Sequence, residues 1–277
     1  MSKQVFTFDE PAVGTDAEVF LLDKQGNPVS AEGIVGGRKN APIQVSANGG
    51  WLEDNVSAEI NIMPVLESEG PAVFSSRIDS VLKALQKHVE KLELKVDITP
   101  ARLFDDKYTT TEQGRESGCS ATFDAWKLVK NPRTELADNW RFCGGDIHLS
   151  HPDVDKLGRY FRPNLARHMD MCFALNEVVV RDMEERSAGK YGRIGIHRPT
   201  PYGVEYKTIG NWWLAKTVWR KAVFNAAIGC LWKTLNYNND EPQFPRYHEY
   251  LQKCRTTWDK NASRQVLEEC GYVRLPA

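Results

Sequence analysis

The chain has 277 residues, of which 41% are hydrophobic and 26% are charged, and its formal net charge is −1. This length and composition are typical of a globular protein with a substantial core. The balanced charge gives no strong signal for nucleic-acid binding or for a membrane surface, and no apolar run reaches the length of a membrane span. The N-terminal segment lacks the apolar core of a signal peptide, and the six cysteines form no C-x-x-C pair. We therefore expect a cytoplasmic protein with reduced, mainly packing thiols.

Periodicity and turn residues predict a mixture of strands and helices. The predicted elements, in chain order, are a strand at 17–23 with a turn at 26–28, a glycine-rich loop at 33–42, a strand at 55–64, a helix at 71–92, a strand and connection at 92–104, a short strand at 143–152, a long helix at 160–186, two strands within 191–210, a tryptophan-rich helix at 211–236 and a further helical segment at 246–271. This order lacks the regular βαβ rhythm of a parallel sheet, so the α+β class with an antiparallel sheet is favoured.

Polar side chains recur at a spacing of two in several predicted strands, and residues two apart share a face of a strand. The pairs are Asp16 with Glu18, Glu59 with Asn61 (Asp54 lies just before them), Asp146 with His148, Glu205 with Lys207, and Arg193 with His197. A single pair of this kind is more often a solvated strand face. The repetition in separate segments favours one shared site.

Carboxylates gathered in a partly buried site repel one another, and burial also disfavours their charged form. A bound cation removes both problems, and oxygen ligands with one imidazole suit Mg²⁺ or Mn²⁺. The number of carboxylates is about right for two or three ions bridged by phosphates. Walker and G-x-G-x-x-G loops are absent from the sequence. In the glycine-rich loop, Arg38 and Lys39 could approach an anion, or the loop could be a surface turn.

Several motifs together resemble a known family. In order along the chain they are GTDAEVFLLD, GIVGGRKNAP, DNVSAEINIMP, GCSATFDAW, GGDIHLSHP and YGRIGIHRPTPYGVEYKTIGNWW. Over residues 14–235 the chain resembles the phage-encoded carboxylate–amine ligases, type 2, of the glutamine synthetase superfamily. The resemblance implies a curved antiparallel sheet that forms a funnel, with helices packed on its outer side. It also implies a single domain over 1–277, with a core at about 14–235 and a helical extension at about 236–277.

The family resemblance implies an ATP-dependent ligase that phosphorylates a carboxylate and lets an amine displace the phosphate to form an amide. The implied cofactors are ATP and Mg²⁺ or Mn²⁺, and the implied substrates are small-molecule or peptide carboxylates and amines. No membrane partner is expected, and the reaction would take place in the host cytoplasm. Members of the superfamily range from monomers to rings, so a homo-oligomer and a monomer both stay open.

The resemblance also assigns roles to individual residues. The implied metal ligands are Asp16, Glu18, Asp54, Glu59, His148 and Glu205. The implied cationic groups for phosphate and the reacting carboxylate are Arg193, Arg198 and Lys207, and the implied ATP-binding residues are Arg38, Lys39, His148 and Arg198. Asp54 and Asp146 are the candidates that would take a proton from the amine. Many relatives carry a histidine in place of Asp146 and an arginine in place of Lys207.

Two other functions fit parts of the same pattern. A non-catalytic phage protein with this fold could act by binding a host partner, and the residues at positions 146 and 207 leave room for that alternative. A metal-dependent hydrolase usually needs paired histidines, but the spacing of His148 and His151 puts them on opposite faces of a strand. The tryptophans between 212 and 232 are expected to pack in the core rather than to stack on adenine. Cys119 and Cys143 are expected to be structural.

Overall fold

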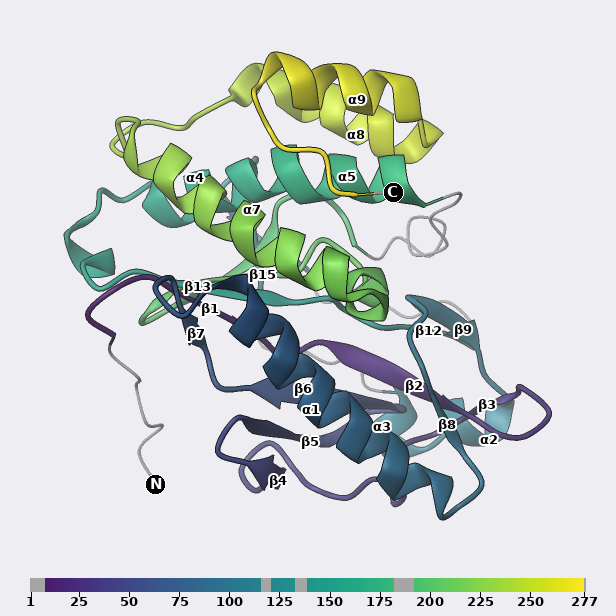
Figure 1. The fold of residues 1–277 in the computed structure, drawn as a ribbon. Coiled ribbons are helices and arrows are strands. Elements are labelled where there is room, and N and C mark those ends of the chain that lie inside the picture. Colours follow the sequence, from purple (N-terminus) through teal and green to yellow (C-terminus); the bar gives the residue numbers. More distant parts are fainter. Residues whose placement is uncertain (1–7, 116–120, 133–138, 182–191, 277) are drawn as a thin grey trace.

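Two antiparallel sheets and a layer of helices make up this computed structural model, which describes residues 8–115, 121–132, 139–181 and 192–276 (Figure 1). The seven-stranded sheet has the order β11-β10-β14-β15-β13-β1-β7, and the six-stranded sheet has the order β3-β2-β6-β5-β4, with β8 also paired to β2. A separate ribbon joins β9 and β12. The strands are β1 Ala12–Thr15, β2 Glu18–Leu22, β3 Pro28–Val29, β4 Ile43–Ser46, β5 Gly49–Asp54, β6 Ser57–Ile62, β7 Val65–Leu66, β8 Lys95–Asp97, β9 Ala101–Leu103, β10 Phe123–Asp124, β11 Val129–Lys130, β12 Trp140–Phe142, β13 Ile147–Ser150, β14 Ile196–Thr200 and β15 Gly203–Tyr206.

Helices and short helical turns make up the rest of the regular structure in the described residues. They are α1 Gly70–Glu90, α2 Asp106–Thr109, α3 Glu112–Arg115, α4 Phe161–Met169, α5 Leu175–Val180, α7 Thr217–Leu235, α8 His248–Thr257 and α9 Lys260–Glu269, with short turns η1 Val154–Lys156, η2 Asp170–Ala174, η3 Asn211–Ala215 and η4 Pro245–Tyr247. α1 packs on β5 and β6, α4 packs on β14 and β15, and α7 contacts both of these helices. In Figure 1 the yellow helices α8 and α9 lie above α5. The mixed helical and antiparallel architecture confirms the predicted α+β class.

The helix expected at 71–92 is confirmed by α1. Its buried face carries apolar side chains at helical spacing, among them Phe74, Ile78, Leu85 and Val89. Pro71 stands in the first turn, where its missing N–H costs no hydrogen bond. This apolar face explains why α1 forms and why it covers the six-stranded sheet.

The strand expected at 17–23 is in fact preceded by a second strand, and the two belong to different sheets. β1 pairs with β13 and β7, whereas β2 pairs with β6, β8 and β3. The prediction that Asp16 and Glu18 share one strand is therefore wrong, because Asp16 and Ala17 lie between β1 and β2. The Thr15 hydroxyl donates to the carbonyl of Asp146 at 2.6 Å and accepts from the Ala17 amide at 3.2 Å. These bonds fix the crossing from one sheet to the other.

The strand expected at 55–64 is confirmed by β6, in which Ala58, Ile60 and Ile62 are buried. Strand β5 was not expected, because its two leading glycines are typical of a loop. Gly50 instead serves a close backbone contact, since a Cβ there would lie 1.9 Å from the carbonyl oxygen of Ile43. The hairpin between β5 and β6 turns at Asn55, whose φ of 56° lies in the left-handed region that asparagine tolerates.

The remaining predictions are largely confirmed. Segment 92–104 contains two short strands, β8 and β9, and helix 160–186 appears as α4, the π turn η2 and α5, with residues 182–186 outside the described part. Segment 211–236 begins with η3 and continues as α7, and 246–271 contains α8 and α9. Segment 33–42 is a loop with one bridge between Arg38 and Ala41.

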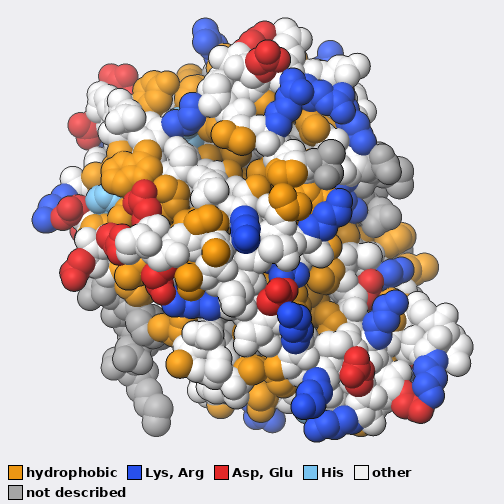
Figure 2. Space-filling view, viewed as in Figure 1, with side chains coloured by type: hydrophobic (Ala, Val, Ile, Leu, Met, Phe, Trp, Pro, Cys, Tyr) orange, Lys and Arg blue, Asp and Glu red, His pale blue; other side chains and the backbone are white. Residues whose placement is uncertain are grey.

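The largest hydrophobic cluster runs from β1 to the C-terminal segment, from Val13 to Leu275. Cys143, Cys172, Cys230 and Cys254 are buried, which agrees with the expected packing role, and Cys119 lies outside the described residues. Within the described part of the chain, we find no helix long and apolar enough to cross a membrane. On the face in Figure 2, acidic and basic side chains are interspersed among apolar and uncharged ones.

A buried ion pair ties α8 to α5 and to the segment before η3. Arg255 donates to the Glu177 carboxylate at 2.6 Å, and the two side chains are 5% and 0% exposed. The other carboxylate oxygen of Glu177 accepts from the amide of Gly210 at 2.9 Å. Since Gly210 bridges to Gly144 beside the cavity described below, this ion pair links the C-terminal helices to the site.

We predict that Arg255→Met lowers the free energy of unfolding by about 3–5 kcal/mol, because the Glu177 carboxylate stays buried without its closest cation. Urea denaturation measures the loss. The matched control is Arg274→Met, which removes an exposed ion pair to Glu268 with an N–O distance of 3.4 Å and should cost less than about 1 kcal/mol. Equal losses in the two variants would contradict the anchoring role of Arg255.

Candidate active site

A cavity of about 500 Å³ lies between strands of both sheets. Of the twelve site residues expected from the sequence, ten line it: Asp16, Glu18, Lys39, Asp54, Glu59, Asp146, His148, Arg198, Glu205 and Lys207. Successive side chains of a strand point to opposite faces of the sheet, so several lining residues alternate with residues that point away from the cavity. Val13 on β1 and Leu149 on β13, for example, are fully buried between lining residues.

One wall of the cavity is a cross-strand row in the seven-stranded sheet. His148 on β13 is paired directly with Glu205 on β15 and with Gly14 on β1, and Arg198 on β14 is paired with Glu205. Directly paired residues of neighbouring strands project from the same face. The row therefore gathers an imidazole, a carboxylate and a guanidinium from positions far apart in the sequence.

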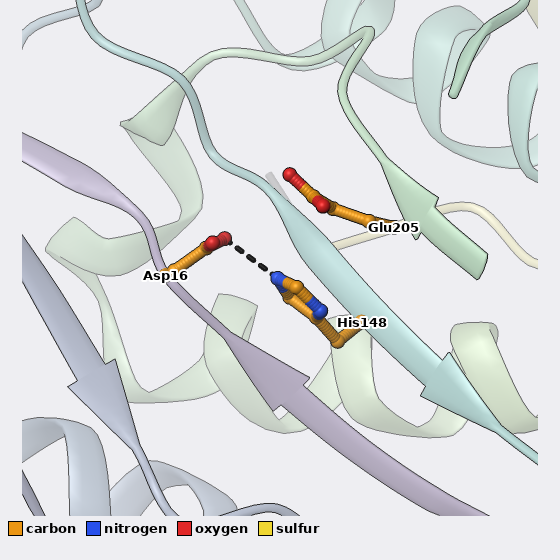
Figure 3. A group of neighbouring side chains, drawn as sticks. All are labelled: Asp16, His148 and Glu205. Atoms are coloured by element: carbon orange, nitrogen blue, oxygen red, sulfur yellow. Dashed lines mark ion pairs between the residues drawn. The ribbon is translucent and has the colours of Figure 1, made fainter. Parts of the chain in front are cut away.

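Asp16 completes a cluster with His148 and Glu205 (Figure 3). Asp16 Oδ1 lies 2.8 Å from His148 Nε2, and each of the three residues offers one ligand atom within 4.8 Å of the others. Burial opposes the charge of Asp16, but the adjacent His148, Lys207 and Arg198 outweigh it and hold the Asp16 pKa below its ordinary value. Burial likewise opposes the charge of His148, yet Asp16 raises the His148 pKa well above 6.5. The two groups thus stabilise each other as an ion pair.

Glu205 lies between two cations. Arg198 Nη1 is 2.6 Å from one carboxylate oxygen, and Lys207 Nζ is 2.8 Å from the other. Lys207 also donates to Asp146, which precedes β13. Burial raises the pKa of Asp146 to about 6, although Lys207 acts in the opposite direction. These four side chains form a continuous network of alternating charge.

The second wall carries two carboxylates from the six-stranded sheet. Glu18 on β2 is paired directly with Glu59 on β6. The Glu18 carboxylate accepts from the Gly144 amide at 2.7 Å, and Glu59 accepts from the Asn61 side chain at 2.8 Å. Burial, with Asp54 and Asp146 nearby, raises the Glu18 pKa to about 8. Burial and the charge of Asp16 raise the Glu59 pKa to about 9, so this wall resists full ionisation.

Asp54 ends β5, and its carboxylate lies 3.5 Å from Lys39 Nζ, so the glycine-rich loop does bring a cation to the cavity. Arg38, the neighbour of Lys39, is exposed and does not line the cavity. Arg193 is also exposed and outside the lining. The expected shared strand face of Arg193 and His197 is wrong, because β14 begins only at Ile196, after a turn at Gly195 with φ of 80°.

Two contributors escaped the sequence analysis. The Tyr202 hydroxyl lies 2.6 Å from His148 Nδ1, and the backbone amide of Gly144 binds Glu18. A backbone donor has no sequence signature. Tyr202 was visible inside the PYGVEY motif, but its turn position gave no reason to expect that it faces a histidine on another strand.

The structure separates other candidate groups from the cavity. His151 follows β13 and does not line the cavity with His148, as expected from their spacing. Trp212 and Trp213 are buried in the core, and the Trp213 ring stacks on Phe74 with ring centroids 6.0 Å apart. Trp232 is 43% exposed and lies outside the lining as well. The interpretation of the tryptophans as packing residues is confirmed for Trp212 and Trp213.

A comparison with curated proteins found no match to this sequence. Solved structures that resemble the chain include one described as "Apo GmaS without ligand", with 12% identity and a TM-score of 0.46, covering 94% of this chain and 63% of that one. Another is described as "Crystal structure of novel glutamine synthase homolog", with 10% identity and a TM-score of 0.31, covering 93% of this chain and 70% of that one. This chain thus spans less than two thirds of the GmaS chain.

A family model described as "Phage phiEco32-like COOH.NH2 ligase-type 2" matches residues 139–255. The matched segment supplies Asp146, His148, Arg198, Glu205 and Lys207 to the cavity. The motifs before residue 139, which supply the opposite wall, lie outside the match. Over residues 139–255 the chain therefore matches the phage carboxylate–amine ligases of type 2, which confirms the resemblance for the two motifs that lie in this segment, GGDIHLSHP and YGRIGIHRPTPYGVEYKTIGNWW.

Proposed function

We propose that this protein is an ATP-dependent carboxylate–amine ligase that forms an amide or peptide bond. The carrying observation is the gathering of six carboxylates, one imidazole and three cations around one cavity, in a chain whose residues 139–255 match a carboxylate–amine ligase family. A carboxylate oxygen of the first substrate attacks the γ-phosphorus of ATP, and ADP leaves. The amine nitrogen then attacks the acyl carbon, phosphate leaves, and the amine gives up a proton.

The donor set of the cavity fits divalent cations such as Mg²⁺ or Mn²⁺. Asp16 Oδ1 and His148 Nε2 are buried and lie 2.8 Å apart, but they lack the alignment of a hydrogen bond. Together with Glu205 they offer two oxygens and one nitrogen for one ion. Glu18, Glu59 and Asp54 would hold a second ion at the opposite wall. Bound divalent ions would neutralise these carboxylates and stabilise the charge that develops on the phosphate oxygens.

The cations of the cavity would bind the anionic parts of the substrates. Arg198 and Lys207 already contact Glu205 and can turn one donor toward a phosphate or carboxylate oxygen. Lys39 reaches the cavity from the glycine-rich loop on the opposite side. Lysine at position 207 keeps the charge but binds an oxyanion through one nitrogen, whereas arginine would offer a fork.

Asp146 is the better candidate to accept the proton of the amine. Its raised pKa of about 6 makes it a stronger base than an ordinary aspartate, while it still ionises near neutral pH. Asp54 stays the second candidate. We also propose that the substrates are small molecules or peptides and that the reaction takes place in the host cytoplasm, as expected for a phage-encoded ligase.

We predict that the purified protein binds Mg-ATP and releases phosphate only when a suitable acid and amine are both present. Calorimetry with a non-hydrolysable ATP analogue tests binding, and phosphate release with panels of amino acids, amines and peptides tests turnover. Glu205→Gln should lower turnover roughly 100-fold or more, because it removes a charged group at the centre of the cavity. Glu268→Gln, the same chemical change at an exposed position of α9, should leave turnover unchanged.

Two results would separate the alternatives. Failure of the wild-type protein to bind Mg-ATP would refute the ligase proposal. Binding of Mg-ATP without turnover on any panel, combined with an intact phage phenotype for Glu18→Ala and Glu205→Ala, would favour the non-catalytic protein that binds a host partner.

We further predict that ionisation of the paired acids Glu18 and Glu59 lowers the free energy of unfolding at alkaline pH when metal is removed. Their folded pKa values of about 8 and 9 exceed the ordinary 4.5, so the folded protein binds more protons than the unfolded chain between these limits. Stability should therefore fall as pH rises from about 5 to 9. Glu59→Gln should reduce this fall by on the order of 1–3 kcal/mol.

Thermal denaturation in a chelator at pH 5, 7 and 9 measures the pH effect for wild type, Glu59→Gln and the control Glu268→Gln. Added Mg²⁺ should restore the stability of wild type at pH 9 and should raise the stability of Glu59→Gln by a smaller amount. If the stability of wild type and of Glu59→Gln fell equally with pH in chelator, the pair Glu18 and Glu59 would not be the cause of the fall.

A further inference from the structure

A tyrosine hydroxyl meets the cavity histidine on the side away from Asp16. Tyr202 Oη lies 2.6 Å from His148 Nδ1, whereas His148 Nε2 faces Asp16 Oδ1 at 2.8 Å. The centroids of the tyrosine and imidazole rings are 6.0 Å apart, and both residues line the cavity. Each ring nitrogen thus has its own neighbour, and Nε2 is the nitrogen that faces Asp16, a member of the cluster with Glu205.

The backbone fixes Tyr202 firmly against β13. Tyr202 lies in the turn between β14 and β15, and its carbonyl accepts from the amide of His151 at 3.0 Å. The next residue, Gly203, is paired with Ser150, and a Cβ there would lie 2.0 Å from the carbonyl oxygen of Leu149. These contacts place the turn that carries Tyr202 beside the strand that carries His148.

The hydrogen bond at Nδ1 determines which nitrogen of a neutral imidazole carries the proton. When Nδ1–H donates to an acceptor, Nε2 keeps a lone pair. When a hydroxyl donates to Nδ1, Nε2 carries the proton and cannot bind a cation. A tyrosine hydroxyl can play either role, and the position of Nε2 beside two carboxylates makes the first arrangement the one that completes a cation site.

We propose that Tyr202 is a positioning residue: its hydroxyl accepts the Nδ1–H of His148 and so directs the Nε2 lone pair toward the cation shared with Asp16 and Glu205. This inference rests on the proposed function. The inference extends the proposed metal site to Tyr202, a residue that lies on a turn and contributes no ligand atom of its own. Groups that orient a ligating histidine in this way commonly change metal affinity 10- to 100-fold when they are removed.

The first test is the titration of Mn²⁺ into the nucleotide-free protein, followed by electron paramagnetic resonance. Tyr202→Phe deletes only the hydroxyl, and we expect roughly 10- to 100-fold weaker Mn²⁺ binding. The matched control is Tyr237→Phe, which removes a hydroxyl from an exposed tyrosine that also lies beside a histidine, His168, away from the cavity. In a His148→Ala background, Tyr202→Phe should have no further effect, because the hydroxyl acts only through the imidazole.

The second test reads the histidine directly. Nitrogen-15 spectra of the Mg²⁺-loaded wild type should show His148 protonated at Nδ1 and not at Nε2. Tyr202→Phe should raise the fraction protonated at Nε2, an effect that a general loss of packing would not produce. A proton on Nε2 in the loaded wild type would overturn the inference.

The outcomes also separate this inference from the proposed function. Equal Mn²⁺ affinity of wild type and Tyr202→Phe, with weaker binding in His148→Ala, would overturn the role of Tyr202 and leave the metal site intact. Equal affinity of wild type and His148→Ala would instead refute the His148 metal site, and the role of Tyr202 would fall with it.

Discussion

The crossing of the chain between β1 and β2 is the constraint on which the cavity depends. Within three residues, the backbone leaves the seven-stranded sheet after Thr15 and enters the six-stranded sheet at Glu18. Asp16 therefore faces the row of His148 and Glu205, while Glu18 faces Glu59 on the opposite wall. Without this crossing the two sets of carboxylates would lie in separate sheets with no shared space. The hydrogen bonds of the Thr15 hydroxyl hold the crossing in place.

The electrostatics of the two walls differ, and the difference follows from their partners. In the seven-stranded sheet, cations match the carboxylates: Arg198 and Lys207 flank Glu205, and His148 pairs with Asp16. In the six-stranded sheet, burial and neighbouring carboxylates raise the pKa values of Glu18 and Glu59, although each carboxylate accepts a hydrogen bond. We therefore expect a bound divalent ion to stabilise the second wall more than the first. Such a cost in stability is common where groups are placed for function.

Much of the candidate site could be predicted from the sequence, because the face of a strand on which a side chain lies depends only on its spacing from its neighbours in the sequence. The spacing of Glu59 and Asn61, and of Asp146 and His148, reports which side chains share a face wherever the strand lies. The same rule failed for Arg193, since the turn at Gly195 breaks the strand before that residue is reached. Strand β5 was missed because glycine, which usually marks a loop, here permits close contact between backbones. Tyr202 was missed because its partner lies on another strand.

The sequence by itself determined the α+β class, the apolar stripe of α1 and the polar faces of the strands, since each depends on residues a few positions apart. Its motifs also pointed to the ligase family that residues 139–255 match. Only the tertiary structure decided that the polar faces meet in one cavity, that Lys39 reaches it while Arg38 and Arg193 do not, and that Tyr202 touches His148. Those facts depend on strand order and on where the chain changes sheets. Contacts between distant segments set both, and no local spacing encodes them.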